Sequence, residues 1–396
     1  MSYSVPSLLI QQEFTNLPVF SQSPLSALII GPNLTLVSSV WTNVVSTPTL
    51  GSVTTPASII TALGDCSVNN PLGYALLQAV NNANGAIVYY IATAAGTGTA
   101  GAYTGGEEAA AYAAALTLAE KGQYYGIVPL TNNTAVYADV VVHVNNESAP
   151  ANAAWRTCWI SPIEGSGTGS AAKTASYISS LTYAGSSEGA TDNSGPRRVH
   201  NVFPPTYTAS DSSTQPGYYL AAGLAGLRSG SVPHQSLTNT QLIGPLATPL
   251  TTTTYSEADL NNLAAAGVWI VTQTPTGGQC YTRHQLTGDA SGFLNYREDS
   301  VVANVDSISY GLQSALAPFV GIYNISPGVL LQIRATIDAE LNYRLTNTYT
   351  QRAGNQLLGY TIVSVAQDPT FLDKLNIVIQ LQVPYPMNYI TVTLSV

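Results

Sequence analysis

The chain has 396 residues and a formal net charge of −9, and only 8% of its residues are charged although 45% are hydrophobic. A typical soluble domain carries about 25% charged residues, so most of this polar surface must be neutral. The acidic balance excludes a nucleic-acid binder, which needs a basic surface. No apolar run reaches the roughly 18 residues of a transmembrane helix without Gly, Pro or several polar residues.

The residue types that remain indicate assembly with other protein chains. Nine of the twelve basic residues are Arg, and Tyr outnumbers Phe by 24 to 6. Protein interfaces are poor in Lys and rich in Tyr, and a nearly uncharged surface favours self-association. Lineage bias or a neutral secreted surface would be the alternative. Because no Lys or Arg precedes Lys121, we expect no secretory signal peptide, which needs a basic first segment.

The first part of the chain is expected to lack helices. Residues 1–20 are interpreted as an N-terminal arm with an apolar stretch that includes Leu8 and Ile10. Residues 21–65 mix short apolar runs with Pro and Thr, which predicts strands and loops rather than helices.

From residue 71 the pattern predicts alternating helices and strands. Helices are expected at 71–85, 107–122, about 134–144, 171–185, 218–230 and 258–267, the last with Ser256 as N-cap. Apolar strands are expected at 85–92, 124–131, 156–161, 198–205, 267–275 and 279–287. This alternation predicts an α/β fold with a mainly parallel sheet that helices cover on both faces, within a region at 21–290.

Near residue 290 the pattern changes to a C-terminal α+β segment. Its clearest helix covers 326–345: Ser326 caps it, Pro327 suits the first turn, and the expected apolar face is Leu330, Ile333, Ile337 and Leu341. Arg334 with Asp338, and Glu340 with Arg344, have the i,i+4 spacing of helical ion pairs. Strands are expected at 357–368, 375–386 and 388–396.

No motif predicts a catalytic, cofactor or metal site. Gly96, Gly98 and Gly101 form a literal GxGxxG, but the following helix opens with Glu107 and Glu108, which would repel a phosphate. A flexible loop is the better interpretation, with a dinucleotide site as the alternative. The pair Glu298 and Asp299 is interpreted as a solvated turn.

The histidines and cysteines likewise show no functional spacing. The four histidines, His143, His200, His234 and His284, lack metal spacing and are expected to be structural or interface hydrogen bonders. The sequence offers no recognisable Ser-His-Asp triad. Cys66, Cys158 and Cys280 are expected to be three reduced, mostly buried thiols.

The last seven residues, ITVTLSV, alternate apolar and polar side chains as a half-buried strand does. No charge follows Lys374, so nothing protects this strand from pairing with another chain. Strand addition to a second copy would use such an edge.

From about Pro71 onward the chain resembles the tail sheath proteins of contractile-tailed bacteriophages. The resemblance rests on residues 216–239, 256–273, 281–288, 296–312 and 356–396, and most specifically on the combination of AGLAGL, LNNLAAAGVWIV and VPYPMNYI. The chain is short for the family, which implies that additional outer domains are missing or reduced.

The resemblance implies a subtilisin-like α/β sheet region with a C-terminal α+β sheath domain and extended strand arms at both ends. The implied divisions are 1–20 (arm), 21–290 (α/β region, with the parallel sheet at 70–290), 291–388 (C-terminal domain) and 389–396 (arm). It also implies that the arms add strands to a small sheet of neighbouring subunits. The residues of this chain to which the resemblance assigns this role are Leu8, Ile10, Ile390, Val392 and Leu394.

In the family a helix of the C-terminal domain faces the tail tube. Residues 327–345 match that helix, with Arg334, Asp338, Glu340 and Arg344 as the implied polar contacts. The implied partners are further copies in stacked sixfold rings, the tail tube protein, and baseplate and tail terminator proteins, without direct nucleic-acid contact or membrane insertion. The implied location is the virion tail, assembled in the host cytoplasm, and the implied function is contraction that drives the tube through the host envelope. Two alternatives are the sheath of a phage-derived injection system, of bacteriocin or secretion type, and a Rossmann-type dinucleotide-dependent enzyme.

Overall fold

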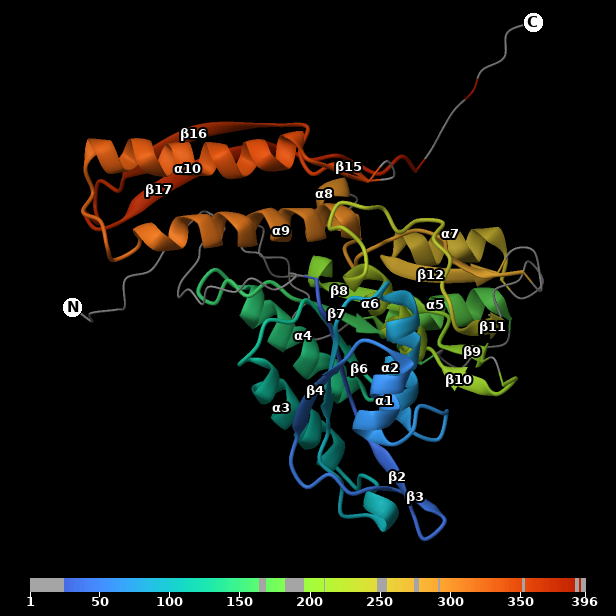
Figure 1. Ribbon diagram of the computed structural model, residues 1–396. Coiled ribbons are helices and arrows are strands. Elements are labelled where there is room, and N and C mark those ends of the chain that lie inside the picture. The colour runs from blue at the N-terminus through green and yellow to red at the C-terminus, as the bar shows by residue number, and fades with distance from the viewer. Residues whose placement is uncertain are drawn as a thin grey trace, which may run out of the picture.

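The computed structural model describes residues 25–163, 169–181, 196–209, 211–247, 255–273, 278–290, 293–350, 353–388 and 392. Figure 1 shows a large sheet with helices packed on it, and a layer of two long helices and a two-stranded ribbon across one end. We call the described part of residues 25–290 the sheet body, and residues 293–388 the C-terminal region.

The sheet body is built on an eight-stranded sheet with the order β13-β12-β8-β7-β6-β1-β5-β4. The strands are β1 (Ala27–Gly31), β4 (Thr49–Val53), β5 (Val88–Ala92), β6 (Gly126–Pro129), β7 (Thr157–Ile160), β8 (Val199–Phe203), β12 (Val268–Gln273) and β13 (Cys280–Thr282). The six central strands run parallel, and the edge strands β4 and β13 are antiparallel to their neighbours. The predicted, mainly parallel sheet is confirmed, and its two antiparallel edge strands make it a mixed sheet.

Helices cover both faces of this sheet, as the continuous apolar strands predict. They are α1 (Pro56–Leu63), α2 (Pro71–Asn82), α3 (Glu107–Ala119), α4 (Thr134–Ser148), α5 (Ser170–Ser180), α6 (Tyr218–Ser229) and α7 (Glu257–Ala265). Within β1, Ala27 and Ile29 point to the face covered by α2 and α6, whereas Leu28 and Ile30 point to the face covered by α3 and α4. Both faces of the central strands are therefore dry.

The C-terminal region contains α8 (Leu294–Arg297), α9 (Asp299–Leu316), α10 (Pro327–Thr346), β16 (Gly359–Gln367) and β17 (Leu375–Gln382). Its own core includes Ile308 and Leu312 of α9, Ile337 and Leu341 of α10, and Ile377 of β17. This core is separate from those of the sheet body, although Ala153 and Trp155 of the body pack against it.

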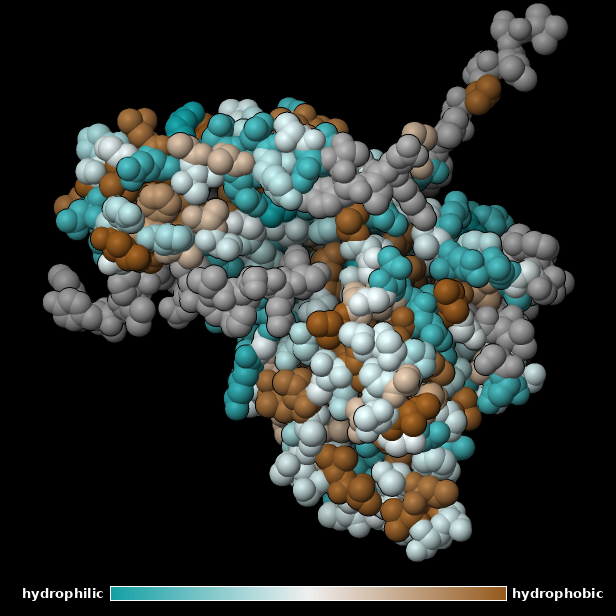
Figure 2. Space-filling view, viewed as in Figure 1, coloured by the Kyte–Doolittle hydropathy of each residue, from teal (hydrophilic) through white to brown (hydrophobic). Residues whose placement is uncertain are grey.

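Smaller elements complete the chain. They are the hairpin β2 (Leu34–Val37) and β3 (Val40–Asn43), the sheet of β9 (Thr206–Ala209), β10 (Thr214–Pro216) and β11 (Pro245–Ala247), the pair β14 (Thr348–Thr350) and β15 (Gly354–Asn355), and the 3-10 turns η1 (Thr99–Gly101), η2 (Pro196–Arg198) and η3 (Ala317–Phe319). Figure 2 shows hydrophobic residues at the hairpin end of the molecule, where Leu36, Val37 and Val40 are exposed.

One sequence expectation is wrong: residues 21–65 include the helix α1. Its start is fixed by Thr55, whose hydroxyl accepts from Ser58 N while the Ser58 hydroxyl accepts from Thr55 N. Pro56 occupies the first turn, where a missing N–H is harmless. This reciprocal cap outweighs the β-branched residues that favour a strand.

The remaining predicted helices and strands up to residue 382 have described counterparts, mostly shorter than expected at their ends. The expected strand at 388–396 lies outside the described residues except for Asn388 and Val392. Cys66, Cys158 and Cys280 are free, and the last two are buried. Among the described residues, no helix is long and apolar enough to cross a membrane, and no cluster of three potential metal ligands occurs.

Candidate interaction surface

The ribbon of β16 and β17 has two strands that, within the described residues, pair only with each other. The strands are antiparallel over their whole length, with an irregularity between Ile362 and Ser364. One face packs on the C-terminal core through Ile362 and Ile377, whereas Val363 and Val378 face outward and are exposed. A two-stranded ribbon with open edges is marginal alone and is a template for further strands.

Helix α10 is held against this ribbon and against α9. The predicted cap is confirmed: the Ser326 hydroxyl accepts from Val329 N at 3.4 Å, and Pro327 lies in the first turn. The predicted apolar face is confirmed at Ile333, Ile337 and Leu341, which are buried in the C-terminal core, and Leu330 is half-buried. The opposite face of α10 is therefore left to solvent.

Arg334 and Asp338 contact β16 in place of the ion pair that their spacing suggests. Both residues are exposed. Arg334 Nη2 donates to the carbonyl of Ile362 at 3.3 Å, and the hydroxyl of Tyr360 donates to Asp338 Oδ1 at 2.8 Å. Burial and the hydrogen bond to Asp338 raise the pKa of Tyr360 to about 12. These contacts orient the two side chains along the edge of α10 next to the ribbon.

Glu340 and Arg344 form the predicted i,i+4 ion pair, with Arg344 Nη2 2.7 Å from Glu340 Oε1. Arg344 is buried against α9, and its Nη1 also donates to Gln356 Oε1 at 2.9 Å. The pair fits there because Gly311 of α9 has no side chain; a Cβ at that position would overlap the ends of both side chains. Arg344 thus directs its donors into the C-terminal region.

The predicted arm positions mostly cannot be placed. Leu8, Ile10, Ile390 and Leu394 lie outside the described residues. Val392 is described, and its side chain is 74% exposed. The chain leading to it is tied to the sheet body and α9, since Asn388 Nδ2 donates to Glu298 Oε1 at 3.0 Å and lies 3.1 Å from His284 Nε2.

The interpretation of Glu298 and Asp299 as a solvated turn is wrong, because both carboxylates are fully buried at the start of α9. Asp299 Oδ1 lies 2.8 Å from His200 Nε2, and its other oxygen pairs with Arg228 of α6. Burial would raise the pKa of Asp299, but Arg228 and His200 outweigh it, so that the pKa is lowered. Glu298 Oε1 lies 2.6 Å from His284 Nε2.

A second buried ion pair ties the next turns of α9 to the body. Arg198 Nη2 donates to Asp306 Oδ1 at 3.0 Å, and the hydroxyl of Tyr125 donates to Asp306 Oδ2 at 3.0 Å. Asp299 and Asp306 are seven residues apart and so share one face of α9. That spacing, with the apolar Val302 and Ala303 between them on the same side, is the sequence signal that would have identified them as buried partners.

The histidines are hydrogen bonded within the chain, as expected. His200 and His284 contact the carboxylates described above, His143 Nε2 lies 2.8 Å from Arg156 Nη1, and His234 Nε2 lies 3.1 Å from the carbonyl of Gly354.

The glycine-rich segment at 96–101 forms a turn that binds a carboxylate of the same chain. The Glu107 carboxylate accepts from the Thr97 hydroxyl at 2.5 Å, from Thr97 N at 3.0 Å and from Thr104 N at 2.8 Å. The Thr97 hydroxyl and these backbone N–H groups lower the pKa of Glu107 to about 2. A negative charge therefore occupies the position that a dinucleotide pyrophosphate would need.

Solved structures show what this arrangement is similar to. A chain in the structure of the anti-feeding prophage baseplate is 16% identical, with a TM-score of 0.65 over 100% of this chain and 99% of that chain. A chain of the contracted PVC sheath complex, an extracellular contractile injection system, is 12% identical with a TM-score of 0.61 over 100% and 95%. The sheath tail protein of Desulfitobacterium hafniense is 11% identical with a TM-score of 0.57 over 93% and 100%.

The chain has the fold of contractile tail sheath proteins. No known family model and no curated protein matches the sequence. The sheath fold covers the C-terminal region as well as the sheet body, because the matched lengths approach those of both chains. At these identities the similarity establishes the fold, and the function is argued below.

Proposed function

We propose that the protein is the structural subunit of a contractile sheath, which polymerises around a tail tube and contracts to drive the tube through a target envelope. The observation that carries this proposal is the match to chains of contractile injection systems, which extends over the whole length of this chain. The nearly uncharged composition supports a chain that buries much of its surface against copies of itself. The subtilisin-like region implied by resemblance would correspond to the sheet body.

The ribbon of β16 and β17 is the acceptor that the predicted arms need. Strands around Leu8 and Ile10 of one neighbour, and around Ile390, Val392 and Leu394 of another, would pair with its two open edges. Each addition joins main-chain hydrogen bonds across subunits, and the alternating apolar side chains would cover the half-exposed ribbon. Such links keep subunits connected while larger surfaces repack during contraction.

The exposed face of α10 is the proposed contact with the tube. Arg334, Asp338 and Glu340 present charged groups beside the exposed Leu331 and Tyr343. Arg344 would act indirectly, because its buried guanidinium fixes Glu340. Partners at the ends of the polymer would be baseplate and terminator proteins. The energy of contraction would be the free-energy difference between two packings of the same subunits, and no nucleotide would be needed.

Two kinds of particle contain such a sheath: a phage tail, assembled in the host cytoplasm, and a phage-derived injection particle. The matches to injection-system structures support the second as strongly as the first. Composition of the purified particle decides between them, since only a phage tail joins a DNA-filled head. The dinucleotide-enzyme alternative is not supported, because the backbone N–H groups of Thr97 and Thr104 already donate to the Glu107 carboxylate.

The arm hypothesis is tested by placing charge on one face of the C-terminal strand. Ile390→Asp with Leu394→Asp should prevent long tubes, because carboxylates would enter the apolar side of the added strand. The matched control is Thr391→Asp with Thr393→Asp, which adds equal charge to the alternate face. Negative-stain microscopy of purified protein measures tube length. Long tubes from the first variant would contradict strand exchange, whereas absence of tubes from unmodified protein would contradict the sheath function itself.

The tube contact is tested by charge reversal on α10. Arg334→Glu should reduce the sheathed length of tails when sheath and tube proteins are produced together, yet leave sheath polymerisation without a tube intact. Lys121→Glu at the exposed end of α3 is the control with the same change in charge. Sheathed tails of normal length with Arg334→Glu would show that this edge of α10 does not contact the tube.

A further inference from the structure

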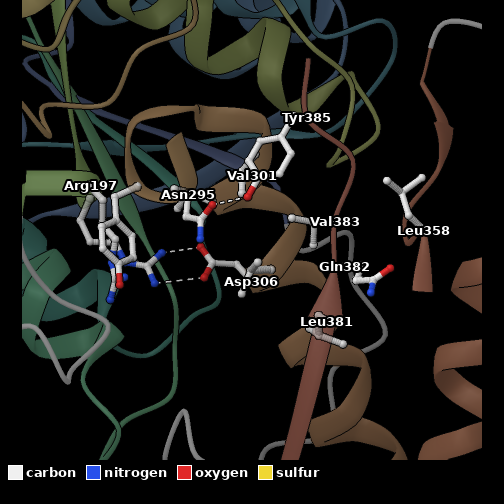
Figure 3. A pocket seen from close by; sticks show the side chains of 13 residues that line it. Arg197, Asn295, Val301, Asp306, Leu358, Leu381, Gln382, Val383 and Tyr385 are labelled. Carbon is white, nitrogen blue, oxygen red and sulfur yellow. Dashed lines mark hydrogen bonds and ion pairs between the residues drawn. The ribbon is translucent and has the colours of Figure 1, made fainter. Parts of the chain in front are cut away.

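A pocket of about 510 Å³ lies between the sheet body, the start of α9 and the end of the ribbon. The residues lining it include Arg197, Val301, Val302, Leu358, Val383 and Tyr385. Figure 3 shows Arg197 and Asp306 toward one side of the view and Val383 and Leu358 toward the other. The volume suits a few apolar side chains.

Part of this lining is apolar surface that lacks a cover in the described structure. Leu358 is 64% exposed, and Tyr385 is also exposed even though its hydroxyl donates to Asn295. At the rim, the guanidinium carbon of Arg197 lies 4.8 Å from the centre of the Tyr296 ring. The pocket therefore combines apolar walls with a cationic edge.

The described chain begins beside this pocket. Leu25 is buried in a small cluster with Tyr125 and Ala303. Ala303 follows the pocket residue Val302 on α9, and Tyr125 donates to the pocket residue Asp306. The first described residue, Leu25, therefore lies close to the pocket wall.

The segment just before Leu25 has the composition that the pocket fits. Leu17, Pro18, Val19 and Phe20 form a short apolar run, and Leu25 follows Phe20 by five positions. An extended chain of that length reaches roughly 17 Å, which is ample for entry into the pocket. Glu13 is the one charged residue in 1–24, and its sign is opposite to that of Arg197 at the rim.

We propose that residues 17–20 of the same chain dock in this pocket. The docked segment would contact Val301 and Val302 of α9 and Val383 beyond β17. Because it is joined to Leu25 of the sheet body, it would link α9 and the ribbon end to that body. It would also fix the point from which residues 1–16 leave the subunit. This inference concerns the single subunit and does not depend on the proposed sheath function.

Cross-linking tests the occupant directly. In a Cys66→Ser background, Phe20→Cys with Leu358→Cys is treated with a short bismaleimide in dilute, unassembled protein. The control pairs Phe20→Cys with Val37→Cys, which is exposed on the distant hairpin β2–β3. We expect linkage within one chain to be at least tenfold faster for the pocket pair, as measured by intact mass. Equal rates would overturn the proposal, and so would linkage only between two chains of different tagged mass.

Accessibility of the pocket gives a second, independent measurement. Leu358→Cys alone should react with a bulky maleimide about tenfold faster when Leu17→Asp and Phe20→Asp are also present, because charged side chains would leave the apolar pocket. Gln22→Asp, outside the apolar run, should not change the rate. An unchanged rate in the double-aspartate variant would overturn the proposal. Circular dichroism checks that all variants are folded.

Discussion

The sheet body and the C-terminal region differ in how completely their strands are buried. In β6, β7 and β8 every residue is buried, because helices cover both faces of the sheet. In β16 and β17 buried positions are few, one face is open, and both outer edges lack a partner strand among the described residues. The body buries its central strands within one chain, whereas the C-terminal region leaves one face of its ribbon exposed.

The joint between the two regions contains buried ion pairs beside its apolar contacts. Asp299 and Asp306 of α9 meet Arg228 and Arg198 of the body in buried pairs. Buried pairs are specific in direction and geometry, so they help to fix the position of α9 on the body. The predictions that follow test this division of the molecule, from the largest expected effect to the smallest.

Removing the joint should have the largest effect. Asp299→Ala leaves Arg228 and His200 buried without their shared carboxylate, and should lower the free energy of unfolding by about 3–5 kcal/mol. Asp338→Ala, an exposed acid on α10, should change it by less than about 0.5 kcal/mol. Urea denaturation followed by circular dichroism measures both. Similar small effects would show that the joint is not ionic.

A core substitution should show whether the C-terminal region unfolds independently of the sheet body. Ile337→Ala removes buried methyl groups from the C-terminal core and should cost about 2–5 kcal/mol. If the region unfolds by itself, amide exchange in β17 should accelerate by at least about tenfold, since 1.4 kcal/mol is a factor of ten. Amides in β6 and β7 should keep their protection. Equal acceleration in both regions would mean that they unfold as one unit.

Two glycines offer a matched comparison of the regions. A Cβ at Gly226 of α6 would overlap the backbone carbonyl of Ala79, which cannot move without shifting α2. Gly226→Ala should therefore cost about 1–3 kcal/mol. A Cβ at Gly311 meets only the ends of Arg344 and Glu340, which can rotate away. Gly311→Ala should cost less than half as much, because side-chain ends can move aside whereas a helix backbone cannot. Thermal unfolding of both variants gives the ranking, and the reverse ranking would contradict this description of the packing.

The smallest effect concerns mild acid. Burial and the Arg156 guanidinium lower the pKa of His143 to about 3, against an ordinary value of about 6.5 in the unfolded chain. The unfolded chain therefore binds the proton first, and stability falls as the pH drops below about 6.5 toward 3. Between pH 7.5 and 5 the loss from His143 should be about 2 kcal/mol.

The same pH experiment has a specific control. His143→Gln keeps an acceptor for Arg156 but cannot be protonated, so its stability should change less between pH 7.5 and 5. The pKa of His234 is also lowered, by burial and by Arg228 against the opposing hydrogen bond to Gly354, so some slope should remain. Denaturant midpoints at several pH values measure this slope. Parallel pH profiles for the two proteins would show that His143 is not the proton acceptor.

Local signals in the sequence were sufficient to predict an element where its caps and its apolar pattern come from its own residues. Ser256 and Ser326 identified two helix starts, and the apolar strands identified a sheet buried on both faces. The local cap at Thr55 was equally readable, but the β-branched residues around it favoured the wrong structure. For the interaction surface, the spacing of Glu340 and Arg344 predicted their ion pair, yet not that Arg344 lies buried against Gly311.

The sequence by itself determined the class of fold, the order of its elements and the charge-poor surface, because each follows from short-range periodicity and composition. Only the tertiary structure decided that Glu298 and Asp299 are buried, that Arg334 and Asp338 turn to β16, and that a pocket opens beside Leu25. Those features depend on groups brought together from residues tens to hundreds of positions apart. Whether a carboxylate is solvated or paired is fixed by such neighbours, and no local pattern specifies them.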